Sequence, residues 1–152
     1  MDSFATIKDW TVSGEDVLEI GSAYGTTAEF RIIGSGEVIV MATTASGLTA
    51  SIVVTVGTCG DNVVWVLDDD TLTVTGTGVM QPDRSEIWRQ VLGKARVVRF
   101  EGSITELPFD SFSSPAIKEI HLPASLVNIN NSFALCVNLE KITLQEPNNA
   151  YR

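Results

Sequence analysis

Residues 117–123 read IKEIHLP, and residues 139–145 read LEKITLQ. The two stretches start 22 positions apart, and apolar residues occupy the first, fourth and sixth place of each. One more step of 22 towards the N-terminus reaches Ala95, Val98 and Phe100, which repeat the spacing. Side chains two positions apart share one face of a β-strand. The pattern therefore predicts three short strands, over residues 97–100, 119–122 and 141–144.

A repeat of this length indicates a solenoid. Periods of about 20 to 29 residues with this apolar spacing are typical of leucine-rich repeats, whose strands pair in parallel. Stacking would bury the columns of Leu, Ile and Phe, and it would bury Cys136 with them. The chain holds about two and a half repeats, so we expect residues 58–93 to cap the first one.

The alternate residues of these strands should form the outer face of the repeat sheet. A period of 22 aligns Val97, Glu119 and Lys141 in one row, and it aligns Arg99, His121 and Thr143 in the next. Solenoids commonly bind partners through such an extended face. The predicted ligand-binding residues are Arg99, Glu119, His121, Lys141 and Thr143. We expect His121 to be exposed, and the alternative is that the whole face only meets solvent.

The segment before the repeats predicts a hairpin and a helix. Two strands, 63–67 and 71–76, flank three aspartates at 68–70. These aspartates indicate a turn, because the spaced oxygens of a calcium loop are missing. A short helix should follow over 82–93, started by Pro82 and capped by Gly93. Trp88 should pack against the first repeat; the alternative is that it joins five nearby cations, Arg84, Arg89, Lys94, Arg96 and Arg99, in binding an anionic polymer.

The first third of the chain predicts an antiparallel sandwich. Candidate strands lie at 4–12, 17–20, 27–33, 37–43 and 48–56, separated by glycines. Ser46-Gly47 marks a hairpin turn inside the uncharged run 38–60, which favours a hairpin over a membrane span. Ala50, Ile52, Val54 and Val56 should form one buried face. The fold class is thus mainly β, with a partial sandwich at 1–57 and a capped solenoid at 58–152.

Two family resemblances agree with this division. Residues 8–57 resemble the later part of a bacterial immunoglobulin-like domain of group 2, through WTVS at 10–13, GEVIVMATT at 36–44 and VVTV at 53–56. Residues 57–146 resemble the BspA-like leucine-rich-repeat family of bacterial surface proteins. That likeness is carried by GTCGDN at 57–62, by LTVTGTG at 72–78 and by the stretch from Ile117 to Leu139. The first family has strands before the tryptophan, so the sandwich here should be incomplete.

The amino-acid composition excludes several classes of function. The net charge of −9 argues against nucleic acid as a partner. Two cysteines do not make a disulfide-rich scaffold, and a single histidine excludes a histidine-rich metal site. No catalytic motif is present, and we expect no metal, no cofactor and no enzymatic activity. A Cys59–Cys136 disulfide is less favoured than two free thiols, because it would join two modules. Residues 1–4 do not start a signal peptide, so an exported parent protein would have to supply one.

The resemblance implies a non-enzymatic adhesion or ligand-binding module of a bacterial cell-surface or secreted protein. Its partner would be a host glycoprotein, a matrix protein or a polysaccharide, bound through the repeat sheet face. The alternative is a structural spacer without a ligand, which could self-associate through the unpaired edge of the sandwich.

Overall fold

A computed structural model describes residues 7–24, 26–83 and 85–145 of the chain. The chain divides into two compact units, Met1–Gly57 and Thr58–Arg152. Each unit is described by itself below, as the N-terminal unit and the C-terminal unit.

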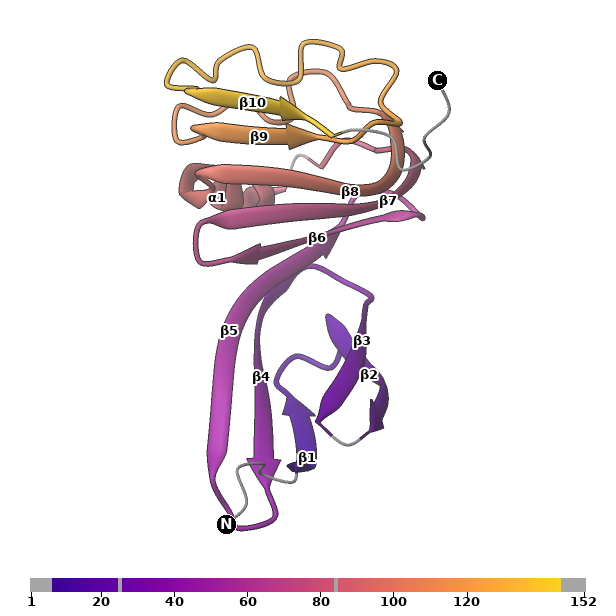
Figure 1. The fold of residues 1–152 in the computed structure, drawn as a ribbon, viewed down its shortest axis with the longest axis vertical. Helices are drawn as coiled ribbons and strands as arrows, with labels where there is room; N and C mark the ends of the chain where they lie inside the picture. Colours follow the sequence, from indigo (N-terminus) through magenta and orange to yellow (C-terminus); the bar gives the residue numbers. More distant parts are fainter. Residues whose placement is uncertain (1–6, 25, 84, 146–152) are drawn as a thin grey trace. The chain divides into compact units, whose positions relative to one another are not determined.

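The N-terminal unit consists of antiparallel strands. β4 (Gly36–Thr44) pairs with β1 (Ile7–Val12) on one side and with β5 (Thr49–Thr58) on the other. β2 (Leu18–Tyr24) and β3 (Thr27–Ile32) form a separate two-stranded sheet (Figure 1). The indole of Trp10 in β1 meets the ring of Phe30 in β3 edge-on, with centroids 6.1 Å apart, so the two sheets touch through these rings. The core residues are Leu18, Val38, Val40, Val54 and Val56.

The hairpin between β4 and β5 turns at the predicted place. Gly47 has φ of 95°, a left-handed conformation that glycine adopts without strain. The Thr44 amide donates to the Leu48 carbonyl across the turn (2.8 Å).

No helix in the described part of the chain has the length and apolar character needed to cross a bilayer.

Only two of the four residues predicted to form a buried face on β5 are buried. Val54 and Val56 are buried, but Ala50 is exposed and Ile52 is 57% exposed. Ile52 and Val53 project from opposite faces of β5 and are 57% and 53% exposed, so neither face of its first half is covered. The alternating pattern therefore identified the strand correctly, whereas burial also needs a second layer, which the first half of β5 lacks.

The C-terminal unit carries a mixed sheet and one helix. β6 (Val63–Asp68) and β7 (Thr71–Val79) form an antiparallel hairpin. β8 (Val97–Glu106), β9 (Glu119–Leu122) and β10 (Lys141–Leu144) then follow β7 in parallel (Figure 1). Asp69, with φ of 56°, lies in the turn between β6 and β7, as the sequence predicted for the three aspartates.

The helix α1 (Glu86–Lys94) begins and ends later than predicted. Ser85 caps its start, because the Ser85 hydroxyl accepts a hydrogen bond from the Trp88 amide (3.2 Å). Gly93 lies inside the helix, and Ala95 is the residue that ends it. Serine was the stronger start signal than Pro82, since its side chain satisfies an amide that a helix end leaves unpaired.

Inward side chains of the sheet and α1 share one core. Trp65 and Trp88 meet edge-on with centroids 5.4 Å apart, and Trp88 meets Phe112 at 5.3 Å. The indole Nε1 of Trp88 donates to the Ser111 carbonyl (2.9 Å). Trp88 is therefore a buried core residue, which excludes the alternative that it binds a polymer at the surface. The other members of this core include Leu72, Val74, Val91, Leu92, Val98, Phe100 and Ile120.

The loops between the parallel strands are tied to one another by polar side chains. The Ser114 hydroxyl donates to the Leu92 carbonyl (2.8 Å), and the Ser125 hydroxyl donates to the Ile104 carbonyl (2.7 Å). The Asn130 amide donates to the Leu107 carbonyl (2.9 Å). The three acceptors are the Leu92 carbonyl in α1, the Ile104 carbonyl in β8 and the Leu107 carbonyl just after β8, so each bond ties a later loop to the preceding part of the unit.

The apolar columns predicted to be buried become exposed at β10. Ile120 is 1% exposed, but Ile142, which pairs with it in register, is 60% exposed. Leu144 is 66% exposed, whereas its partner Leu122 is partly buried. The difference arises because each layer is covered by the layer that follows it, and in the described part of the chain no strand pairs with β10 on its outer side.

Candidate functional site

The outward side chains of β8, β9 and β10 pair in the register that was predicted from the sequence. Glu119 pairs with Val97 on one side and Lys141 on the other. His121 lies two residues further along β9 and pairs with Arg99 and Thr143. Strands β8, β9 and β10 thus bring all five predicted site residues together on one face, which is called the row face from here on. Its members are Arg99, Glu119, His121, Lys141 and Thr143.

A contact between Glu119 and His121 lies at the centre of the row face. The Nε2 of His121 donates to the Oε2 of Glu119, 2.5 Å away. This hydrogen bond lowers the pKa of the Glu119 carboxyl below its ordinary value. The positive charges of Lys141, His121 and Arg99 lower that pKa further, and partial desolvation opposes them. Glu119 is therefore held as an anion among cations.

His121 lies on the outer face of the sheet as predicted, but it is less exposed than expected. Its side chain is only 13% exposed, although it points outward from the sheet as the alternation requires. The hydrogen bond to Glu119 keeps the ring against the strand instead of letting it extend into solvent. The sequence pattern correctly predicts the side of the sheet, but it does not show that a neighbouring carboxylate will hold the imidazole down.

The two cations on the row face remain available to a ligand. Arg99 and Lys141 are exposed, and neither forms an ion pair with another residue that the structure describes. Thr143 adds a hydroxyl that can both donate and accept. The row face can therefore offer exposed positive charge, one carboxylate and a hydroxyl to a polar partner.

The two cysteines are not placed for catalysis. Cys59 is buried, and burial together with the nearby charge of Asp83 raises the pKa of its thiol to about 12. Cys136 is buried as well, and its Sγ–H donates to the Phe112 carbonyl (3.1 Å). Burial also raises the pKa of the Cys136 thiol. Because a thiolate is the reactive form, neither group serves as a nucleophile near neutral pH. The structure has both as free thiols.

The three aspartates at 68–70, at the turn between β6 and β7, are not arranged to hold a metal ion. Asp68 pairs with Thr71 at the end of the β6–β7 hairpin, and the Asp70 carbonyl accepts from the Arg96 and Val97 amides. Within residues 7–24, 26–83 and 85–145, no group of three or more His, Cys, Asp or Glu side chains is arranged to hold a metal ion.

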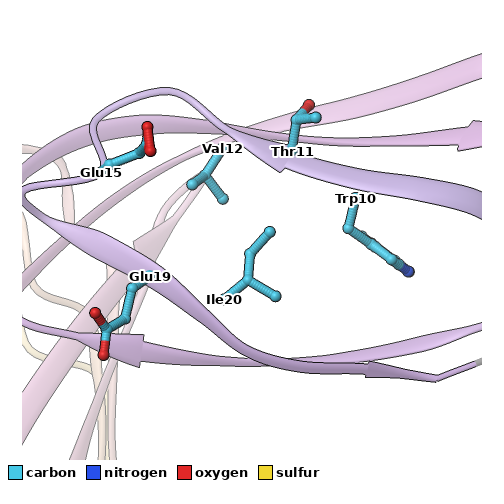
Figure 2. A pocket seen from close by; sticks show the side chains of 6 residues that line it. All are labelled: Trp10, Thr11, Val12, Glu15, Glu19 and Ile20. Carbon is cyan, nitrogen blue, oxygen red and sulfur yellow. The ribbon is translucent and has the colours of Figure 1, made fainter.

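A cleft in the N-terminal unit was not found from the sequence. Its volume is about 500 Å³, and its walls are formed by Trp10, Thr11, Val12, Glu15, Glu19 and Ile20. Figure 2 shows Val12 and Ile20 pointing towards each other, with the two carboxylates at one end. Glu19 already pairs with Arg31, so only the Glu15 carboxylate is free of a described cation. The cleft offers an apolar floor with little polar chemistry.

Comparisons with known proteins give one structural likeness. No family model matches the chain, and no curated protein matches it. The crystal structure of a leucine-rich repeat protein from Eubacterium ventriosum ATCC 27560 is similar to 58% of this chain, with 20% identity and a TM-score of 0.47. The matched region spans 25% of that protein's chain.

Proposed function

We propose that the chain is a non-enzymatic binding module of a bacterial cell-surface or secreted protein. It would bind a host glycoprotein, a matrix protein or a polysaccharide through the row face. In this proposal the C-terminal unit is a BspA-like leucine-rich-repeat solenoid with a period of 22. The N-terminal unit is a partial immunoglobulin-like domain of group 2.

The row face is the observation that carries this proposal. Three strands hold five polar side chains in two aligned rows, and the cations Arg99 and Lys141 lack an ion-pair partner in the described part of the chain. Paired strands fix the spacing of these groups along and across the sheet. A polar surface with fixed spacing suits a partner that repeats its own polar groups, such as a polysaccharide.

The test is binding of labelled protein to an array of glycans and matrix proteins at low and moderate salt. We expect saturable binding that survives moderate salt, and we expect Glu119→Lys and Lys141→Glu to weaken it. Lys8→Glu and Glu37→Lys change exposed charges in the N-terminal unit and serve as matched controls. Binding that is unchanged by the row-face variants would contradict the assignment of this face.

The second candidate is a structural module that associates with itself. The N-terminal unit favours it, because Ile39 and its partner Val53 are 45% and 53% exposed on one face of the sheet. Ile52 is 57% exposed on the opposite face. Scattered apolar residues are normal at a surface, but three within one strand pair mark a place for contact.

Light scattering at several concentrations tests this second candidate. Association through the strand pair predicts a mass that rises with concentration and falls after Val53→Lys. Thr55→Lys, on the same face of the same strand, is the control. A constant monomer mass would exclude self-association under those conditions.

A further inference from the structure

The strongest unassigned feature is a hollow at the start of the parallel strands. Its volume is about 520 Å³, which lies in the range of small-molecule sites. Five side chains on its walls carry charge: Lys94, Arg96, Lys118, Asp69 and Asp70. The uncharged residues that complete its walls are Gly93, Pro115, Ala116 and Asn138.

The backbone ladder fixes the spacing of these charges. The Arg96 amide donates to the Asp70 carbonyl, and the Lys118 amide donates to the Arg96 carbonyl, both over 2.8 Å. Asp70, Arg96 and Lys118 are therefore successive steps of the stack, one for each strand. Lys94, in the last turn of α1, adds a third cation beside this series.

The cations of the hollow are open to a ligand. Lys94 and Arg96 are exposed and form no ion pair with any residue of the described ranges. The Lys118 Nζ lies 3.7 Å from the Glu140 Oε2, and the two side chains are 44% and 70% exposed. Such surface pairs are weak, so an incoming anion can displace this one. Three of the chain's ten lysines and arginines thus surround one hollow in an acidic protein.

The acceptor groups that line the same hollow require hydrogen-bond donors from the ligand. Asp69 and Asp70 can only accept when ionised, and they repel a ligand that is negative throughout. The Nδ2 of Asn138 donates to the Pro115 carbonyl (2.9 Å), which leaves the Asn138 Oδ1 as a further acceptor. A ligand that fits must therefore combine one carboxylate with several hydroxyl groups.

From this arrangement we propose that the hollow binds an acidic sugar of the hexuronate class. The Arg96 guanidinium takes the carboxylate through two parallel hydrogen bonds, and Lys94 and Lys118 add positive charge. Asp69, Asp70 and the Asn138 carbonyl accept from the ring hydroxyls. This site is separate from the row face and does not depend on it.

The experiment is a nuclear magnetic resonance titration of the full chain with D-glucuronate, D-glucose and acetate. Glucose lacks the carboxylate, and acetate lacks the hydroxyls. We expect glucuronate to shift the amide signals of residues 94–96 and 116–118 saturably, with a roughly millimolar dissociation constant. Glucose and acetate should each bind at least about tenfold more weakly, because each offers only half of the contacts.

Variants locate the site. Arg96→Gln should weaken glucuronate binding about tenfold or more, and Lys94→Gln at the exposed helix end provides a second variant if the first one misfolds. Arg89→Gln removes the same charge from an exposed position of α1 that lines neither the hollow nor the row face, and it should leave the affinity unchanged. The proposal is overturned if glucuronate gives no saturable shift, if acetate or glucose binds equally well, or if Arg89→Gln has the larger effect. None of these outcomes bears on row-face binding by a macromolecule.

Discussion

The two buried tryptophans of the C-terminal unit should respond differently to the same substitution. Trp65 and Trp88 are 0% and 2% exposed, and their rings touch. They differ in one respect, since the Trp88 Nε1 donates to the Ser111 carbonyl while no described residue accepts from the Trp65 Nε1. Trp65→Phe and Trp88→Phe therefore form a matched pair.

The expected magnitudes follow from this difference. Either substitution removes part of a buried ring, at a cost of about 1–2 kcal/mol when scaled from roughly 0.8 kcal/mol per methylene group. Trp88→Phe also leaves the buried Ser111 carbonyl unpaired, which adds about 1–3 kcal/mol. Trp65→Phe instead removes an unsatisfied donor, which offsets part of its cost. Trp88→Phe should be the more destabilising substitution by about 1–3 kcal/mol.

Thermal and urea unfolding followed by far-ultraviolet circular dichroism measure the two free energies without relying on tryptophan fluorescence. For a unit of this size, each 1 kcal/mol should move the midpoint by roughly 4–8 °C. Equal destabilisation by the two variants, or a larger loss with Trp65→Phe, would refute the reasoning that the Ser111 hydrogen bond is what separates them.

Three further outcomes follow from the C-terminal unit. Ile120→Ala should lower the unfolding free energy by about 2–5 kcal/mol, whereas Ile142→Ala should lower it by less than about 1 kcal/mol. The reason is that Ile120 is 1% exposed and Ile142 is 60% exposed. Equal losses for the two variants in urea unfolding would contradict this. Gly102→Ala should lower the thermal midpoint more than Gly78→Ala: both have positive φ, but only at Gly102 would a new Cβ lie 2.4 Å from a carbonyl oxygen of the adjacent strand. Cys59 holds its proton up to a pKa of about 12 when folded against 9.0 when unfolded, so its contribution to stability is complete below about pH 9 and is lost as the pH rises towards 12. The unfolding free energy should therefore fall between pH 8 and about pH 10.5, and it should fall less for Cys59→Ala than for the unaltered chain. Equal decreases for the two proteins would contradict the effect of the Cys59 thiol.

Several features of the fold were predictable because they depend on local pattern. The apolar spacing of residues 117–122 and 139–144 predicted which residues pair across β9 and β10, since register in a sheet follows the buried face. The turn at Gly47 and the hairpin around Asp69 were predicted for the same kind of reason, because their backbone conformations favour particular residue types.

Other features depend on contacts that a local pattern does not contain. Ile52 alternates like a buried residue but lacks a covering layer, and Ile142 lies in the last described layer of the stack. His121 was expected in solvent, but its hydrogen bond to Glu119 holds it at the surface of the sheet. Each of these differences arises from a neighbour, present or missing, and not from the strand itself.

The hollow at Arg96 and Lys118 was also beyond sequence reasoning. Its walls come from a hairpin turn, the end of α1 and two loops of the stack, and only the folded chain brings these together. The sequence showed a concentration of cations between residues 84 and 99, but it did not show which of them face a common space.

The most direct test of the central claim is an exchange of charges on the row face. The double variant Glu119→Lys/Lys141→Glu keeps the net charge at −9 and keeps opposite charges on two residues that pair in register. Its affinity for the strongest partner found on the glycan and matrix-protein array should be compared with that of the unaltered chain. If the row face is the binding site, the exchange should abolish saturable binding while the circular dichroism spectrum stays unchanged. Unaltered affinity would show that binding depends on overall charge or on another surface, and it would contradict the account.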